Sequence, residues 1–251
     1  FILNSLKNNT TLLNHPLSTH KPQTSKMSTV ANEWRDKLAN DLEVKKLGTT
    51  ENFYDAWSKD YDECLDKWGY KAPGFTAQLL NKYMTNPTDP SGKFKILDVG
   101  AGTGLVGQEI VKYDRFKGSV IYGNDLSGEL LNIANKKSVY SSLQQLDSMN
   151  VVPYPYPDNT FDAITCIGTL TYCKNFPKLF NEWIRISKPG AVIIATHRSD
   201  MMVKDKTFFN GLVATLKWKK LAHIAGEPYL PNNTNYANKV VVEYYVARNT
   251  K

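Results

Sequence analysis

The amino-acid sequence predicts an α/β fold, built on a doubly wound and mostly parallel sheet of seven strands. From residue 93 onward, short apolar runs typical of strands alternate with segments that have the apolar periodicity of helices. The first of these runs, KILDV, passes directly into a glycine-rich loop that opens a helix. Near the C-terminal end, two apolar runs are separated only by a loop, which predicts an antiparallel edge on the sheet.

The composition is that of one globular domain with a full core. The chain has 251 residues, of which 41% are hydrophobic. No run approaches the roughly 18 consecutive apolar residues of a membrane-spanning helix, so we expect no membrane partner. The three cysteines form no disulfide framework, and no Cys/His spacing suggests zinc. We therefore expect reduced thiols, a cytoplasmic protein and no metal site.

The formal net charge of +7 is diffuse. Three lysines in the first 26 residues supply part of it, and a small cluster lies at Lys217, Lys219 and Lys220. A nucleic-acid-binding domain usually gathers its basic residues on one face. The charge is better interpreted as solvated surface, and we do not expect a nucleic-acid partner.

Residues 1–26 differ from the rest of the chain, being rich in Asn, Thr, Ser and Lys and free of acidic residues. They could be a transit peptide, although they lack arginine, or a disordered tail. They could also be a non-native extension upstream of Met27, and we favour this interpretation because MSTVANEW is typical of an N-terminus. The predicted organisation is then an N-terminal helical segment over residues 27–92 and a core over residues 93–251.

The N-terminal segment carries an aromatic stripe. Tyr54, Trp57 and Tyr61 are spaced i, i+3 and i+7, on one face of a helix that Leu65 and Trp68 continue. The ordinary interpretation is a stripe that faces the core. Tyrosine, however, also suits a surface that is partly apolar and partly wet. A second helix is predicted to begin near Pro73 and to lead into the first strand.

The core elements follow in order. Strands are predicted within residues 93–100, 119–127, 141–147, 161–170 and 191–198, with a closing pair around 221–226 and 239–249. Helices are predicted over residues 105–114, 128–140, 175–187 and 207–219.

The glycine loop follows the first strand in KILDVGAGTGLVG. Gly100, Gly102 and Gly104 permit a sharp turn and a close approach of backbone to a ligand, with a helix N-terminus behind. Loops of this kind bind both nucleotides and S-adenosylmethionine. Asp98, two residues before Gly100, would oppose a pyrophosphate but could fix the loop beneath a cationic ligand that carries an amino acid. The loop therefore favours S-adenosylmethionine.

Further polar positions lie at the ends of successive strands. Asp125 could accept both hydroxyls of a ribose, or it could instead be the N-cap of the next helix. Asp147 could accept from an adenine amino group while the amide of Ser148 or Met149 donates to the ring. The fourth strand ends at residues 167–169, where the reacting end of the ligand would lie. Acidic or glycine residues at the ends of four successive strands favour one common binding site.

Four segments resemble the motifs of class I S-adenosylmethionine-dependent methyltransferases, in the right order. They are ILDVGAGTG, the acid in YGNDLS, the acid before PYPDNTFD, and ISKPGAVIIATH, and the resemblance covers roughly residues 50–250. More narrowly, FYDAWSKDYDECLDKWGYKAP and CIGTLTYC resemble the Williams–Beuren-region methyltransferase-like proteins. The resemblance implies a Rossmann-like fold and S-adenosylmethionine as cofactor, with the aromatic stripe in a lid over it. The segment VVPYPYPDNT carries extra residues relative to the family pattern.

The candidate cofactor-binding residues are the lid aromatics, the glycine loop and the strand ends: Tyr54, Trp57, Tyr61, Asp98, Gly100, Ala101, Gly102, Thr103, Gly104, Asp125, Leu126, Asp147, Ser148, Ile167, Gly168 and Thr169.

Methyl transfer is an in-line displacement, for which a protein supplies alignment, exclusion of water and, for O or N nucleophiles, a route for the proton. His197, which follows the fifth strand and is expected to face the pocket, and Tyr61 are the candidate catalytic residues. Arg198, Thr169 and Tyr172 are the candidate substrate-binding residues.

The sequence also narrows the acceptor. No Asn/Asp-Pro-Pro-Tyr follows the fourth strand, which disfavours methylation of nucleobase amines, and no Pro-Cys pair suggests cysteine attack on a pyrimidine. We expect a monomer that methylates an O or N nucleophile on a small molecule. The alternatives are a catalytically silent S-adenosylmethionine-binding regulator, a protein methyltransferase and, more distantly, a nicotinamide-dependent oxidoreductase.

Overall fold

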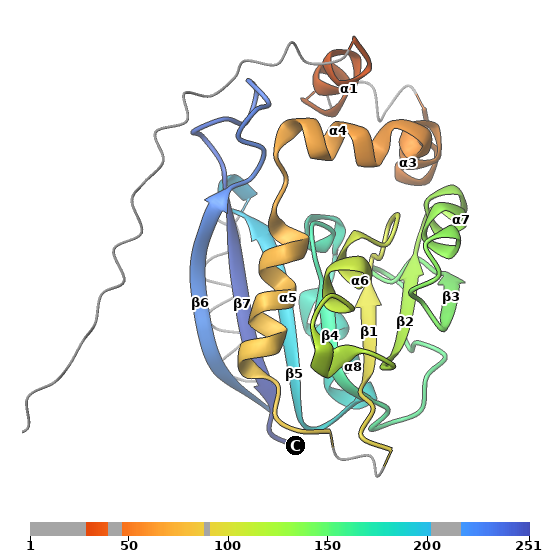
Figure 1. Ribbon diagram of the computed structural model, residues 1–251, viewed down its shortest axis with the longest axis vertical. Helices are drawn as coiled ribbons and strands as arrows, with labels where there is room; N and C mark the ends of the chain where they lie inside the picture. The colour runs from red at the N-terminus through yellow and green to blue at the C-terminus, as the bar shows by residue number, and fades with distance from the viewer. Residues whose placement is uncertain (1–28, 40–46, 88–90, 202–216) are drawn as a thin grey trace, which may run out of the picture.

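The computed structural model describes residues 29–39, 47–87, 91–201 and 217–251 (Figure 1). The N-terminal extension over residues 1–26 and most of the predicted helix over 207–219 lie outside this part of the chain. None of the described helices is both long and apolar enough to cross a membrane.

The core is a single sheet of seven strands in the order β3-β2-β1-β4-β5-β7-β6. The strands are β1 (Lys95–Val99), β2 (Val120–Asp125), β3 (Ser142–Gln145), β4 (Phe161–Cys166), β5 (Ser187–Arg198), β6 (Trp218–Pro228) and β7 (Val241–Asn249). The pairs among β1 to β5 are parallel, whereas β7 pairs antiparallel with both β5 and β6. The predicted doubly wound sheet with an antiparallel C-terminal edge is confirmed.

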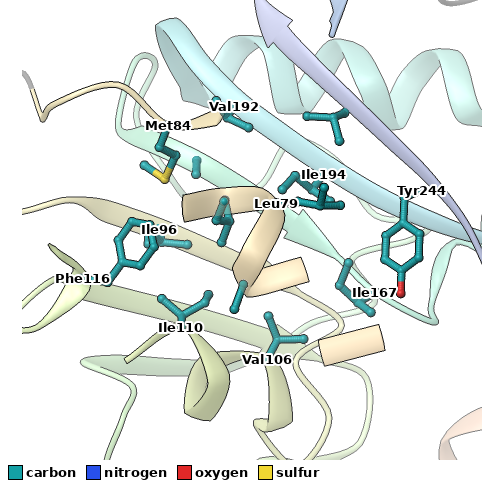
Figure 2. Close-up of a cluster of buried hydrophobic side chains, with 14 of the residues drawn as sticks. Leu79, Met84, Ile96, Val106, Ile110, Phe116, Ile167, Val192, Ile194 and Tyr244 are labelled. Atoms are coloured by element: carbon teal, nitrogen blue, oxygen red, sulfur yellow. The ribbon is translucent and has the colours of Figure 1, made fainter. Parts of the chain in front are cut away.

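Helices cover both faces of the sheet, which explains why its central strands are apolar on both sides. In β1, Ile96 contributes to a buried cluster with α5 (Ala72–Tyr83) and α6 (Leu105–Ile110), and Figure 2 shows this cluster. The next residue, Leu97, contributes to the cluster on the other face, beneath α8 (Phe176–Ile186). The alternation of Ile96 and Leu97 thus ties both helical layers to one central strand.

A third cluster lies above the sheet. It joins α1 (Thr29–Ala39), α3 (Thr50–Trp57) and α4 (Tyr61–Trp68) to the loop between β6 and β7. The predicted continuous helix is interrupted, because the 3₁₀ turn η1 (Ser58–Asp60) separates α3 from α4. In Figure 1 the arrowheads of β1 and β2 point toward α3 and α4. This layer therefore covers the carboxyl ends of the parallel strands.

Several elements end at residues other than those predicted. The predicted helix over 105–114 ends at Ile110, and the predicted helix over 128–140 is α7 (Gly128–Lys136), after which Ser138 has a φ of +57°. That left-handed residue cannot continue a helix. Strand β5 begins at Ser187, earlier than the predicted Ala191.

Candidate functional site

The glycine loop between β1 and α6 needs its glycines for different reasons. All three have positive φ: +70° at Gly100, +56° at Gly102 and +87° at Gly104. A Cβ on Gly100 would lie 2.3 Å from Oγ1 of Thr169, so that glycine permits close packing against the end of β4. A Cβ on Gly102 would meet nothing within 4 Å. Because Gly102 also lines the main cavity, the loop presents bare backbone to that space.

The main cavity has a volume of about 510 Å³, within the range of small-molecule sites. It lies where the glycine loop and the ends of β2 and β4 meet α3 and α4. Of the residues predicted from the sequence, those lining it are Tyr54, Tyr61, Gly100, Ala101, Gly102, Thr103, Asp125, Leu126, Asp147, Ser148, Ile167, Gly168, Thr169 and Tyr172. The fold thus brings together residues from four strand ends and from the N-terminal helices.

Asp125 lies at the end of β2 with its carboxylate on the glycine loop. Its Oδ2 accepts the backbone N–H of Gly102 at 2.8 Å, and its Oδ1 accepts that of Ser127 at 3.0 Å. The N-cap of α7 is Ser127, whose hydroxyl accepts from Leu130, so Asp125 is not the cap. Burial raises the pKa of Asp125, and these backbone hydrogen bonds partly offset that effect. A carboxylate has further lone pairs, so Asp125 retains the capacity to accept from a ligand.

Asp98 is a positioning residue rather than a contact in the cavity. It is 1% exposed and accepts hydrogen bonds from Tyr140 Oη at 2.7 Å and Thr165 Oγ1 at 2.8 Å. Burial raises its pKa to about 6, against the lowering effect of these two donors. Tyr140 Oη in turn accepts the N–H of Gly107 at the start of α6. Asp98 therefore fixes the loop from below.

Tyr140 was missed by the sequence analysis. A Cβ on Gly104, Gly107 or Gly123 would lie 2.8, 2.6 or 3.0 Å from atoms of its ring. The ring thus fills a space made by three glycines from two elements. Those glycines are visible in the sequence, but their common neighbour is visible only in the fold.

The lid, formed by α3, η1 and α4, is held to the core by side-chain hydrogen bonds. Its acidic residues bind polar groups around the cavity. One of them, Asp62, makes an ion pair with Lys137 of the core, with 2.6 Å between Oδ2 and Nζ. The contacts are Glu51 with Gln145, Asp55 with Ser127, Asp62 with Thr103 and Lys137, and Tyr54 with Tyr172. Such exposed and half-buried polar contacts are individually weak, and they suit a segment that opens and closes.

The predicted aromatic stripe divides into two roles. Tyr54 and Tyr61 line the cavity, whereas Trp57 is 2% exposed and does not. Trp57 packs behind them, with ring centroids 5.6 Å from Trp34, 6.1 Å from Tyr54 and 4.7 Å from Tyr61. Burial raises the pKa of both tyrosines well above their ordinary value, so their hydroxyls stay protonated.

Gly104, His197 and Arg198 do not line the main cavity. His197 is 3% exposed and its ring lies 6.5 Å from that of Phe176 in α8. Along β5, His197 shares the α8 face with Ala195, because side chains alternate between the faces of a strand. The structure thus places His197 outside the main cavity, in a small separate cavity that Tyr70 and Gly168 also line. The Arg198 guanidinium lies 4.8 Å from the ring of Tyr236 and pairs with Asp200 at 2.6 Å.

Other cavity-lining residues were not singled out by the sequence analysis. Tyr70, between α4 and α5, reaches the end of β4, where a Cβ on Gly168 would lie 3.0 Å from its hydroxyl. The remainder are Thr49, Thr50, Glu51, Pro73, Leu105, Val106, Leu130, Asn150 and Lys174. Leu65, which continues the aromatic stripe, and Met149, whose amide is a candidate for the adenine ring, also line the cavity. Tyr70 follows the aromatic stripe directly, which could have suggested it. Asn150 lies beyond a short strand and carries no such signal.

Residues 97–195 match the model of the methyltransferase domain family. Human methyltransferase-like protein 27 is 32% identical over 162 residues, which are 62% of this chain and 61% of that relative. The chain spans 36% and 42% of the length of two further curated relatives.

Two solved structures share the fold with a TM-score of 0.55 each. One is geranyl diphosphate C-methyltransferase from Streptomyces coelicolor A3(2), in complex with Mg²⁺, geranyl-S-thiolodiphosphate and S-adenosyl-L-homocysteine, at 14% identity over 70% of this chain and 75% of that one. The other is the [4+2]-cyclase SpnF, at 17% identity over 70% of this chain and 81% of that one. Residues 97–195 are thus similar in sequence to the methyltransferase domain family, and the chain shares the fold of these two solved structures.

Proposed function

We propose that this chain is an S-adenosylmethionine-dependent methyltransferase that acts on an O or N nucleophile of a small molecule. The observation that carries the proposal is the cavity in which the bare backbone at Gly102 faces the lid beside the carboxylate of Asp125. The methyltransferase domain match over residues 97–195 and the relative bound to S-adenosyl-L-homocysteine support the same cofactor.

The described residues fit this cofactor. The open space at Gly102 admits the amino-acid end of a ligand close to backbone, and Asp125 lies within the same loop to accept ribose hydroxyls. Asp147 and Ser148 line the cavity beyond β3, on the side assigned to adenine. Carboxylates and tyrosine rings also suit a ligand that carries positive charge.

When bound, S-adenosylmethionine supplies a methyl group already activated by its sulfonium. The lid residues Tyr54 and Tyr61 exclude water from the cavity, and the glycine loop holds the donor in line with the acceptor. Thr169 and Tyr172 orient the acceptor at the end of β4. Arg198 and His197, which lie outside this cavity, act through the structure around it rather than on the reacting atoms.

The acceptor proposal rests on the size of the cavity and on its place beneath the lid. A cavity of about 510 Å³ beneath a lid suits a small molecule better than a polynucleotide. We also propose a monomer in a reducing compartment such as the cytoplasm, supported by the unpaired thiols of Cys64, Cys166 and Cys173. A silent cofactor-binding regulator and a protein methyltransferase are the alternative functions.

Calorimetric titration with S-adenosylmethionine, S-adenosylhomocysteine and NAD tests the cofactor. We expect the first two to compete for one site and NAD not to bind. Incubation with a metabolite extract, followed by measurement of S-adenosylhomocysteine, tests turnover. Binding without any turnover would favour the silent regulator, and binding of NAD alone would favour the oxidoreductase.

A further inference from the structure

Tyrosines surround the end of the cavity nearest to β4. Tyr54, Tyr61, Tyr70 and Tyr172 all line it, and we call these four residues the tyrosine cage. The ring centroid of Tyr54 lies 6.2 Å from that of Tyr61 and 6.1 Å from that of Tyr172. The hydroxyls of Tyr54 and Tyr172 lie 2.8 Å apart, joining the lid to the segment after β4. Tyr229 extends the aromatic wall, 5.7 Å from Tyr70.

A cage of this kind has a specific chemical preference. The face of a tyrosine ring carries negative electrostatic potential and attracts a cation within about 6 Å of its centroid. Several rings around one space recognise alkylated ammonium groups better than neutral groups of the same shape. The cage therefore favours a positive charge in the space that its four rings line.

The same residues are poor acceptors of a proton. Burial raises the pKa of Tyr54, Tyr61 and Tyr70 well above the ordinary value, with neighbouring phenols adding to the effect. Among the described residues that line the cavity, the carboxylates are Glu51, Asp125 and Asp147. They accept hydrogen bonds from Gln145, the loop amides and Asn150 respectively, and none of them belongs to the cage. The phenols of the cage itself thus offer no base to a hydroxyl acceptor, which must lose its proton.

We propose that the acceptor is a small amine whose nitrogen receives the methyl group inside the tyrosine cage. This inference rests on the proposed methyltransferase function. The amine gives its proton to water on the open side of the cavity, where Tyr172 is 38% exposed, and enters neutral. Its lone pair forms the new C–N bond while the C–S bond breaks and its electron pair stays on sulfur. The positive charge passes from the sulfonium to the new ammonium, so the cage holds one cation before and after transfer.

Choline and its neutral carbon isostere 3,3-dimethyl-1-butanol test the cage without knowledge of the natural acceptor. Each is titrated calorimetrically into the full chain saturated with S-adenosylhomocysteine. We expect choline to bind at least about fivefold more tightly, the equivalent of about 1 kcal/mol of cation–π attraction. Equal binding of the two probes, or binding of neither, would overturn the inference. Failure of S-adenosylhomocysteine itself to bind would instead overturn the proposed function.

Paired variants of Tyr61 distinguish the contribution of the aromatic ring to choline binding from that of the hydroxyl. Tyr61→Phe keeps the aromatic face and is expected to keep the preference for choline within about twofold, whereas Tyr61→Leu is expected to lose it. Tyr113→Leu, a half-buried tyrosine outside the cavity, serves as the matched control and is expected to change nothing. Where Tyr61→Leu does not fold, Tyr172→Leu at the exposed side of the cage carries the same test. A Phe variant that loses as much as the Leu variant contradicts a cation–π role.

Turnover measurements then distinguish amine acceptors from alcohol acceptors. Small primary, secondary and tertiary amines are compared with alcohols of matched shape, and S-adenosylhomocysteine release is measured. We expect release with amines and at least tenfold less with the matched alcohols. Preferential methylation of the alcohols, or of alkenes at carbon, would overturn the inference.

Discussion

Replacing Asp125 by alanine tests the assignment of the ribose to the end of β2. In the structure this carboxylate accepts two backbone N–H groups, at 2.8 and 3.0 Å, and we expect it to accept two ribose hydroxyls as well. Hydrogen bonds to a charged group contribute about 1.5–3 kcal/mol. The loss of one such bond weakens binding by roughly 10- to 150-fold, since 1.4 kcal/mol corresponds to a tenfold change, so Asp125→Ala should weaken S-adenosylmethionine by at least this much.

Calorimetry on the folded variant gives the affinity directly. Asp114→Ala provides a matched control, because Asp114 is an exposed carboxylate in a surface turn. The control should bind as the unmodified chain does, and Asp125→Asn should fall between the two because it keeps one acceptor oxygen. The thermal midpoint of Asp125→Ala should stay within a few degrees, since the N-cap of α7 is Ser127. Unchanged affinity in a folded Asp125→Ala would refute the ribose assignment.

Four further outcomes are expected. The lid, residues 50–68, should exchange amide hydrogens faster without S-adenosylmethionine than with it, and equal strong protection in both states would make it ordinary core. Below its ordinary pKa of 3.8 Asp98 is neutral in both states, and as pH rises to about 6 its contribution to stability should fall by ~3 kcal/mol. As pH rises from 3.8 to about 6, the thermal midpoint of the unmodified chain should therefore fall relative to that of Asp98→Asn. Equal changes in the two midpoints would contradict the effect of burial on Asp98. His197→Ala should lower stability by about 1–3 kcal/mol while kcat of the folded protein stays within threefold, whereas a large loss of kcat would restore His197 as a base. Gly102→Ala should weaken cofactor binding more than it lowers the thermal midpoint, and Gly100→Ala should do the reverse because its Cβ meets Thr169.

The sheet could be predicted from the sequence because each of its strands is indicated by a short stretch of neighbouring residues. Each parallel strand is a short apolar run, and the glycine loop after β1 marks the edge where the site lies. Asp125 could be assigned to that edge because a side chain at a strand end has a place fixed by topology. The cavity lining includes most of the residues chosen in this way.

The remainder depends on contacts that sequence spacing does not encode. The side of β5 on which His197 lies follows from the register of the whole strand, and one residue of shift exchanges the faces. The turn η1 interrupts the helix that carries the aromatic stripe. Trp57 packs inward against Trp34, whereas Tyr54 and Tyr61 line the cavity. The tyrosine cage likewise combines α3, α4 and the turn after α4 with Tyr172, which lies in a 3₁₀ turn after β4 about a hundred residues further along the chain.

The central claim is that the cavity beneath the lid is the S-adenosylmethionine site with its reacting end at the tyrosine cage. A crystal structure of the complex with S-adenosylmethionine tests it most directly. The account predicts ribose hydroxyls on the carboxylate of Asp125 and the sulfonium within about 6 Å of the ring of Tyr61. A cofactor bound elsewhere, or bound in this cavity with its sulfonium turned away from the cage, would contradict it.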